Sequence, residues 1–349
     1  MQPVSDFDFD LPPELIAQEP SAIRDQARLF CLDRKTQKHL HHRICDLPTL
    51  LKPGDLLVAN DTRVYPARLL GRREPSGGAV ECLLLARVDR DCWDVLLHPG
   101  QKLKEGASVI FERDGFQLRL EVLAKHFHGR RTVRLTSENA TDIDQAIDAI
   151  GHIPLPPYIK RPDLSVDRDR YQTVYARARG SVAAPTAGLH FTPELLDALD
   201  AKCIERTTIT LHVGFGTFQP IRSEHIQQHH LDAERFEVTK NAAALINTAL
   251  DEGRRVVAVG TTTTRVLEAC ARLGRGRVQA GTGSTRLYIY PEFDFQVVGA
   301  LLTNFHLPRS SLLVLVCAFA SRQQALSAYA EAVADEYRFY SYGDAMLIT

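Results

Sequence analysis

The sequence predicts an α/β protein: a three-layer domain, with helices on both faces of a sheet, accompanied by a small strand-rich domain. Three observations lead to this fold class. The 349 residues leave room for about two domains, and 44% hydrophobic with 24% charged residues is typical of soluble globular chains. Short apolar strands crowd the region before Ser137. After Asp142, strands alternate with helices.

The strand-rich region extends from Gly54 to Ser137. Its apolar runs contain Val, Leu and Phe, alternate partly with polar residues and are separated by Pro-Gly, Gly-Gly and Asp-Gly turn signals. The predicted strands are 54–60, 67–73, 79–88, 92–97, 107–112, 117–124 and 132–136. So many short strands in succession are typical of a small antiparallel barrel or sandwich.

The region after Asp142 has the rhythm of a βαβ domain. Predicted strands are 207–213, 255–259, 286–290 and 296–302. Predicted helices are 194–201, 240–252, 265–273, 311–320 and 323–337. This alternation favours a largely parallel sheet between two helical layers. The residues alone leave open whether the strand-rich region precedes this domain or is inserted into it.

Charge, hydropathy and cysteine usage exclude several classes of protein. Lys plus Arg total 42 and Asp plus Glu total 43, so the net charge is −1 and nucleic acid is not held by bulk positive charge; a local basic patch remains compatible. The apolar run 312–320 is too short to span a membrane, and the acidic start does not resemble a signal peptide. The seven cysteines form no C-x-x-C pair, which indicates reduced thiols and a cytoplasmic location.

Several polar loops follow predicted strands, where α/β sheets bind ligands. In Gly260-Thr261-Thr262-Thr263-Thr264-Arg265, hydroxyls and helix amides can hold an anion, whereas a structural cap needs only one hydroxyl. In 183–193, Thr192 and Pro193 start a helix, but the small residues before them would let a ligand approach the backbone. His190 in that stretch is either a base or a buried structural histidine.

Two further loops have the same placement. His212 precedes Gly214-Phe215-Gly216, but the dinucleotide-binding fingerprint is not completed, so a glycine-rich bend is the alternative. The stretch 303–311 follows an apolar strand and precedes an apolar helix, where its polar residues serve either a ligand or the helix cap.

The remaining candidates are weaker. Arginines between 63 and 73 either grip phosphates or form a solvated basic edge, and the aromatic residues of 337–346 are expected to dock against the core. His225 and His229 stand four apart, but no Glu lies between them, and His39 with His41 fits a surface strand. No metal site is therefore expected. These residues indicate an enzyme acting on an anionic or nucleotide-like ligand.

At these motifs the chain resembles the S-adenosylmethionine:tRNA ribosyltransferase-isomerase family of the queuosine pathway. The resemblance extends almost from end to end. It is carried by blocks in the family's order: 6–12, 15–18, 53–64, 151–159, 171–175, 183–191, 210–218, 260–265, 303–308 and 340–345. Two departures are Asp61, where the family has Asn, and Asp232, where a histidine is expected.

The resemblance implies an activity and its partners. The ribosyl group of S-adenosylmethionine would be transferred to 7-aminomethyl-7-deazaguanine in a tRNA anticodon stem-loop and rearranged to give epoxyqueuosine, with release of adenine and methionine. S-adenosylmethionine would be a consumed substrate, and no cofactor is implied. The resemblance also implies a barrel domain (61–149) inserted into a discontinuous α/β domain (1–60 and 150–349). A monomer is favoured.

The resemblance and the loop chemistry together nominate the site residues. The acids and bases, taken as a pool, are His190, His212, His306 and Asp344. Residues expected to bind S-adenosylmethionine are Thr186, Gly188, Gly214, Gly216, Thr261, Thr262, Arg265, Asn304 and Tyr342. Residues expected to bind RNA are Arg63, Arg68, Arg72, Arg73, Tyr158, Tyr171 and Tyr175. The alternatives are an enzyme on a free nucleotide or sugar phosphate, and a non-catalytic RNA-binding protein.

Overall fold

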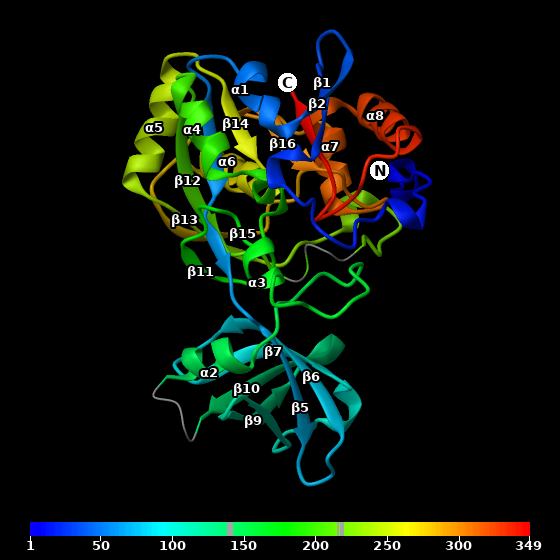
Figure 1. Cartoon of the computed structure of the whole chain (residues 1–349), viewed down its shortest axis with the longest axis vertical. Coiled ribbons are helices and arrows are strands. Elements are labelled where there is room, and N and C mark those ends of the chain that lie inside the picture. Colours follow the sequence, from blue (N-terminus) through cyan, green and yellow to red (C-terminus); the bar gives the residue numbers. More distant parts are fainter. Residues whose placement is uncertain (138–141, 215, 217–219) are drawn as a thin grey trace.

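A computed structural model of the chain describes residues 1–137, 142–214, 216 and 220–349, and divides them into a sheet-and-helix body and a smaller barrel (Figure 1). The body is built on a nine-stranded sheet of order β15-β13-β12-β3-β14-β16-β17-β1-β2. Its strands are β1 (Arg28–Leu32), β2 (His39–Arg43), β3 (Leu56–Asn60), β12 (Glu205–Leu211), β13 (Glu234–Val238), β14 (Val256–Val259), β15 (Gly281–Thr285), β16 (Val298–Asn304) and β17 (Ala345–Ile348).

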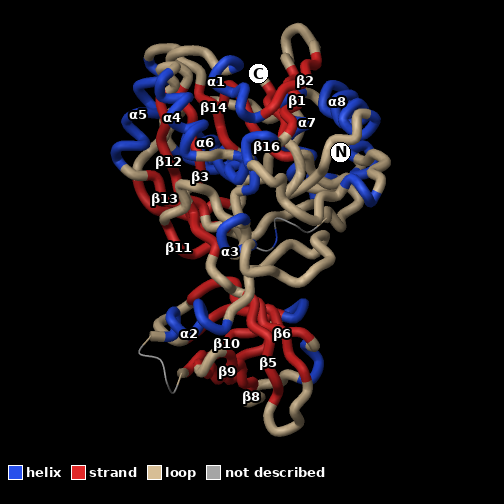
Figure 2. The backbone as a smooth tube through the Cα atoms, in the orientation of Figure 1, coloured by secondary structure: helices blue, strands red, loops and turns tan. Residues whose placement is uncertain are grey.

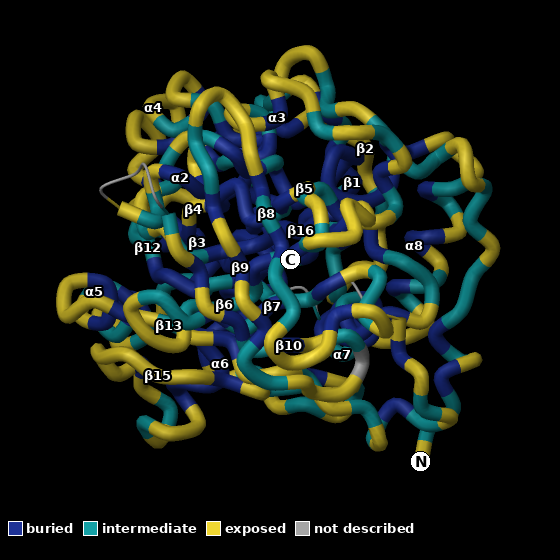
Figure 3. Tube along the Cα trace, turned by 90° about the horizontal axis from the view of Figure 1, so that it is seen from below, coloured by how far each residue is buried: buried dark blue, intermediate teal, exposed yellow. Residues whose placement is uncertain are grey.

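Helices cover both faces of this sheet, as expected for a three-layer domain. Alternate residues of a strand point to opposite faces, so Leu56 and Val58 join one hydrophobic core while Leu57 and Ala59 join the other. The first core is completed by α5 (Lys240–Asp251), α6 (Thr261–Leu273), α7 (Ser311–Ala320) and α8 (Arg322–Ala334). The second core is completed by α1 (Leu47–Leu50) and α4 (Pro193–Ala201). Figure 3 shows buried backbone running through the interior.

The longest parallel run lies at the centre of the sheet, and β1 also pairs in parallel with β17 near one edge. Strands β12, β3, β14 and β16 run parallel to one another, whereas β13, β15, β17 and β2 each add an antiparallel pair. The expectation of a largely parallel sheet is thus wrong at both flanks. The predicted strand 286–290 is also wrong: the strand is β15, and Leu287 and Ile289 pack against the core after it ends. Strands β1, β13 and β17 have no predicted counterpart, whereas β2 agrees with the surface strand expected at His39 and His41.

The smaller body is a closed antiparallel barrel, which confirms the predicted fold class. Its strands are β5 (Arg68–Arg73), β6 (Ala79–Arg87), β7 (Cys92–His98), β8 (Ser108–Arg113), β9 (Phe116–Lys125) and β10 (Arg130–Thr136). Helix α2 (Ile143–Ile150) packs on the barrel core through Ala146, Ile147 and Ile150. Of the seven strands predicted in this region, the first is β3 of the large sheet and the other six form the barrel.

The barrel is inserted into the α/β domain. Strand β3 precedes the barrel in sequence, yet it pairs on both sides with β12 and β14, which follow the barrel. The connection passes through β4 (Thr62–Val64), which pairs with the returning strand β11 (Ala178–Ser181) (Figure 2). The bounds placed at residues 60 and 150 stay a prediction.

No single helix in the described ranges is long and apolar enough to cross a membrane; α7 and α8 meet the length and composition criteria only as a pair, with a bend of 115° between them.

Glu268 of α6 gives a test of how this fold is held together. Its buried carboxylate accepts the main-chain N–H groups of Gln296, Val297 and Val298 at 2.9, 3.0 and 2.9 Å, where the chain enters β16. Glu268→Ala leaves these donors without an acceptor and is expected to lower the free energy of unfolding by about 3 kcal/mol or more. Urea denaturation measures the change. Glu252→Ala, at an exposed surface position, should change it by less than about 0.5 kcal/mol; equal losses would contradict the assignment.

Candidate functional site

The carboxyl ends of the four parallel strands lie on the side of the sheet that faces the barrel, since β3 continues directly into β4 and the barrel (Figure 1). Asn60, the last residue of β3, joins these ends. Its Oδ1 accepts the N–H groups of Leu211 and Thr62 at 3.0 and 3.1 Å, and its Nδ2 donates to the Leu211 carbonyl and to Thr262 Oγ1 at 3.0 and 3.5 Å. The crevice beyond parallel strand ends is where α/β sheets bind ligands.

Asn304, the last residue of β16, contacts one predicted histidine, His190, and lines a small cavity with another, His306. Asn304 Nδ2 lies 3.2 Å from His190 Nε2 and donates to the Tyr340 carbonyl at 3.0 Å. His306 Nε2 lies 2.8 Å from Thr303 Oγ1, and its main-chain N–H donates to Tyr329 Oη at 3.0 Å. His190 and His306 thus line two cavities that share Ser341, and their roles as acids or bases stay a prediction.

Burial keeps both imidazoles neutral. Loss of hydration lowers the pKa of His190 to about 4 and the pKa of His306 to about 3. A neutral imidazole that accepts the Asn304 N–H at Nε2 carries its proton on Nδ1, so His190 is a hydrogen-bonding group of defined tautomer. Neither histidine holds a second proton at pH 7, so each acts there as a neutral group that hydrogen-bonds to or positions a neighbour.

Two small cavities open beside these histidines. One of about 30 Å³ is lined by His306, Thr186, Tyr158 and Tyr340, and another of about 20 Å³ is lined by His190, Arg24 and Tyr342, with Ser341 in both. Volumes of this size accommodate a water molecule or one functional group. The buried Asn304 Oδ1 has no hydrogen-bond partner among the described residues, which leaves an acceptor available at this point.

Asp344 and Tyr342 have structural contacts instead of a place facing a ligand. The Asp344 carboxylate accepts the main-chain N–H groups of Arg28 and Arg338 at 2.9 and 2.8 Å, which joins the C-terminal segment to the start of β1. Tyr342 Oη donates to Asp167 Oδ1 at 2.7 Å, although its ring lines the His190 cavity. The predicted role of Asp344 as an acid or base lacks support from its surroundings, because both oxygens already accept backbone donors.

The threonine turn differs from its prediction because α6 begins at Thr261, four residues early. Thr263 and Thr264 donate to carbonyls of their own chain, those of Val259 and Gly260, at 2.7 and 3.2 Å. The other two, Thr261 and Thr262, are buried just after the end of β14, where Thr262 accepts a hydrogen bond from Asn60. This is the position expected for contact with a ligand.

Arg265 is buried and already holds an anion. Its Nη1 pairs with the carboxylate of Glu234, and its Nε donates to the Leu287 carbonyl at 2.8 Å. The buried Nη2 has no partner within the described part of the chain and borders a small cavity with Tyr288 and Leu312. Glu234 neutralises the positive charge that was expected to bind a substrate carboxylate. Only Nη2 of Arg265 could still donate to a ligand, so a two-bond contact between the guanidinium and a carboxylate is not available.

A much larger cleft of about 780 Å³ lies between the barrel and the β13–β15 edge of the sheet. His212 lies here, apart from His190 and His306. Its Nδ1 is 2.9 Å from Thr62 Oγ1, and its ring packs against Gly180, where a Cβ would come within 2.7 Å of Cε1. Burial, and then the nearby charge of Arg235, lower the pKa of His212. The three predicted histidines thus line three different cavities.

Three arginines that sequence reasoning missed line this cleft. Arg87 ends β6, Arg179 is in β11 and Arg235 is in β13. Arg179 lies over the Tyr65 ring at 5.1 Å, and Arg87 over the Trp93 ring at 5.4 Å. No sequence signal marks these residues, because they come from distant segments and each is isolated among ordinary neighbours. The cleft combines arginines with aromatic faces, as nucleic-acid sites do, but Asp144 and Glu237 also line it. Arg87 pairs with Asp144 at 3.1 Å and Arg179 with Asp148 at 2.8 Å.

The predicted arginine cluster is dispersed in the structure. Arg68 is held by the Glu81 carboxylate at 2.8 and 3.0 Å. Arg72 and Arg73 lie farther along β5, toward the hairpin at the barrel end remote from the sheet domain (Figure 1). Arg63 is exposed on β4. The four arginines therefore do not form one cluster, because β5 extends from the domain junction toward the far end of the barrel.

The predicted tyrosines also pack internally. Tyr171 is fully buried, and Tyr175 contacts the Phe191 ring edge-on. Tyr158 stacks on Tyr340 with ring centroids 4.2 Å apart. Tyr171 has no face to offer an RNA base, since its ring is covered by protein.

The predicted glycines have separate local reasons. A Cβ at Gly188 would lie 2.3 Å from Tyr175 Oη, so this position is set by packing. The Gly214 N–H donates to Glu234 Oε1 at 3.0 Å, and Gly216 lies close to Asp232. Asp232, the departure from the family pattern, pairs with Arg130 of the barrel across the domain junction. Phe215, Thr217 and Phe218 of this motif lie outside the described residues.

Comparison with known proteins decides the family. The model of the queuosine biosynthesis protein family matches residues 4–348. This chain belongs to that family. Among the family's curated members, the S-adenosylmethionine:tRNA ribosyltransferase-isomerase of Desulfitobacterium hafniense is 48% identical over 99% of both chains. The enzyme of that name from Symbiobacterium thermophilum is 50% identical over 99% of both chains.

A solved structure supports the queuosine-family assignment at the level of the fold. The crystal structure of an S-adenosylmethionine tRNA ribosyltransferase from Thermotoga maritima aligns with a TM-score of 0.56 at 39% identity, covering 99% of this chain and 100% of the other. The resemblance identified from sequence blocks is therefore confirmed, and so is the fold class.

The buried histidines predict how the stability of this queuosine-family protein depends on pH. Their pKa values are lowered on folding, so below pH about 6.5 the unfolded chain binds more protons and stability falls as pH falls toward about 4. Each histidine contributes about 1.4 kcal/mol per pH unit in that window. His306→Gln should flatten the pH dependence of unfolding measured by urea titration. His126→Gln, on an exposed barrel loop, should not; an equal slope in both variants would contradict the assignment.

Proposed function

We propose that this chain is an S-adenosylmethionine:tRNA ribosyltransferase-isomerase. It would transfer and isomerise the ribosyl group of S-adenosylmethionine onto 7-aminomethyl-7-deazaguanine in tRNA, releasing adenine and methionine and giving epoxyqueuosine. The observation that carries the proposal is end-to-end family membership, and a large cleft lined by arginines and aromatic rings is consistent with it. S-adenosylmethionine is a consumed substrate in this proposal, and we further propose a cytoplasmic monomer that needs no cofactor.

The cleft is the proposed entry for the anticodon stem-loop. Its volume of about 780 Å³ lies in the range of sites that enclose a small ligand or an extruded base. Arg179 and Arg235 supply charge for phosphates, and Trp93 and Tyr65 supply faces for unstacked bases. His212 lies on the same wall, within reach of a base held there, and a neutral imidazole at that point can accept a proton from an attacking amine.

The strand-end crevice is the proposed place of S-adenosylmethionine. Thr261 and Thr262 at the start of α6 offer hydroxyl and amide donors to its carboxylate, the chemistry of a helix N-terminus. The free acceptor Asn304 Oδ1, next to His190, suits an exocyclic amine such as that of adenine. Neutral His190 and His306 then position the leaving group in a site from which water is largely excluded.

The first prediction concerns turnover. Incubating the protein with S-adenosylmethionine and an anticodon stem-loop bearing 7-aminomethyl-7-deazaguanine should release adenine, detected by chromatography. The same stem-loop with unmodified guanine should release none, because the attacking amine is absent. If neither adenine nor methionine appears with the modified RNA, the proposal is wrong. Binding of RNA without turnover would favour a non-catalytic binding protein, and turnover without RNA would favour an enzyme on a free nucleotide.

The second prediction concerns the cleft arginines. Arg235→Ala and Arg179→Ala should each weaken stem-loop binding and reduce the slope of log K against log salt by about 1, since each removes one phosphate contact. Fluorescence anisotropy across a salt series measures both quantities. Arg72→Ala, on the same strand as Arg68 but toward the remote end of the barrel, is the matched control and should leave the slope unchanged. A larger effect of Arg72→Ala would place the RNA elsewhere.

A further inference from the structure

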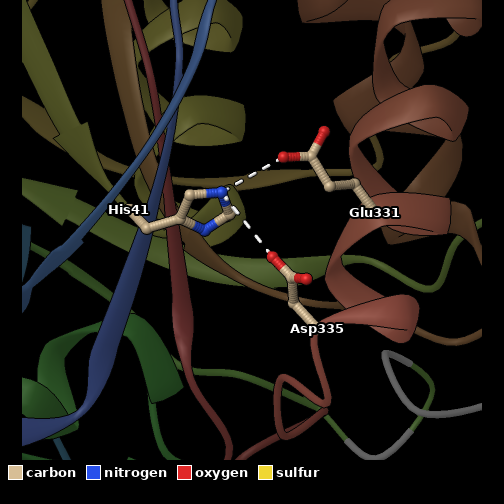
Figure 4. Close-up of side chains that lie close together, drawn as sticks. All are labelled: His41, Glu331 and Asp335. Atoms are coloured by element: carbon tan, nitrogen blue, oxygen red, sulfur yellow. Dashed lines mark hydrogen bonds and ion pairs between the residues drawn. The ribbon is translucent and has the colours of Figure 1, made fainter.

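A group of metal-ligating side chains lies far from the cleft, between the edge strand β2 and the end of α8 (Figure 4). His41 comes from β2, Glu331 from the last turns of α8, and Asp335 directly follows that helix. Glu331 and Asp335 stand four residues apart, so both carboxylates lie on the helix side that faces the strand. One atom from each of the three residues lies within 4.8 Å of the other two.

The distances between the three ligand atoms are close to those between neighbouring ligands of a bound metal ion. His41 Nε2 lies 3.1 Å from Glu331 Oε1 and 3.7 Å from Asp335 Oδ2. Ligands bound to zinc at about 2.0–2.1 Å in a tetrahedron are separated by about 3.3 Å, which falls between these two distances. A cation would thus need only small side-chain movements to contact all three atoms.

The surroundings of His41 set the tautomer that a metal requires. His41 Nδ1 lies 2.9 Å from Tyr337 Oη. When Nδ1 carries the proton and donates it to that oxygen, the lone pair on Nε2 is free and directed at the two carboxylates. Histidines that bind metals almost always use their other ring nitrogen in this way, because the outer hydrogen bond fixes the ring and raises its basicity.

A second histidine positions the glutamate. His39, two residues before His41 and on the same face of β2, has Nδ1 2.6 Å from Glu331 Oε2, while its ring packs on Phe30. The other carboxylate oxygen of Glu331, Oε1, therefore faces His41.

Charge and access are compatible with a cation. The side chains of His41, Glu331 and Asp335 are 39%, 38% and 45% exposed, so an ion can reach them from solvent. One cation is close: Arg28 stacks on Tyr337 and its Nη1 donates to the main-chain carbonyl of Asp335 at 2.6 Å. The two negative charges of the carboxylates exceed the single positive charge of Arg28. Arg28 bonds to the main chain of Asp335, so the Asp335 side chain can still face His41.

We propose that His41, Glu331 and Asp335 form a binding site for a divalent transition-metal ion of the zinc type, with a fourth position open to water. The donor set of one imidazole and two carboxylates is one that zinc accepts. The ion would join β2, at the edge of the sheet, to the end of α8. The chain continues from there to Tyr340 and Ser341, which line the cavity beside His306, so the bound ion would stabilise the segment that carries them.

Zinc binding to the full-length protein tests the proposal. After removal of metals with a chelator, titration calorimetry with zinc chloride should show a site whose affinity falls at least tenfold in His41→Asn and in Asp335→Asn. Saturating zinc should raise the melting temperature of the parent protein and not of these variants. Asp335→Asn is conservative and half-exposed, so it keeps the test informative if His41→Asn folds poorly; circular dichroism checks both.

His42→Asn is the matched control, because the neighbouring side chain lies on the other face of β2, 3.9 Å from Asp46. It should leave zinc affinity and the melting shift unchanged. Zinc bound equally by the parent and by Asp335→Asn, or no zinc bound by the parent, would overturn the proposal and leave an ordinary histidine–carboxylate pairing. Cobalt in place of zinc should give the visible absorption of a four-coordinate ion, which the Asp335→Asn variant would lose.

Discussion

The central constraint on this protein is the burial of β3 in the middle of the large sheet. All five of its residues are buried, and it pairs with β12 on one side and β14 on the other. Its carboxyl end continues straight into the barrel, so the barrel must lie beyond the carboxyl ends of the parallel strands. That single placement creates the cleft, directs His212 into it and brings the strand-end crevice next to it. Asn60 stabilises the junction, because its amide bonds to neighbouring backbone within the dry core.

Burial also sets the chemistry of the histidines. His190 and His306 are surrounded by protein and hold their hydrogen bonds with Asn304 and Thr303, so hydration cannot support a second proton on either ring. His212, at the wall of the open cleft, is less strongly affected. The histidines therefore occupy two electrostatic environments, one buried in protein and one at the wall of the open cleft. The burial of each ring sets its pKa and hence whether it can take up a proton.

Long-range packing explains which predictions were correct. The barrel strands and α7 have apolar patterns long enough to be read locally, and they were located to within a few residues. Strand β17 has only four residues, and it becomes a strand because β16 and β1 pair with it from both sides. The stretch 286–290 has a strand-like composition, yet its apolar side chains pack against the core. The main-chain carbonyl of Leu287 accepts the Nε–H of Arg265. Local propensity gives no information about either partner.

The site shows the same division. The sequence by itself determined the family and the two kinds of domain. It also placed Asn304 and His306 at the end of β16, where the ends of parallel strands converge, whereas His190 reaches Asn304 from the segment after β11, outside the large sheet. Only the tertiary structure decided which charges are available. Arg265 is neutralised by Glu234, Arg68 is held by Glu81, and Asp344 is used by backbone amides. Arg87, Arg179 and Arg235 come together from three distant segments, and the first two of them pair with Asp144 and Asp148. Electrostatic partners are chosen by distance in space, and the linear order of residues does not contain that distance.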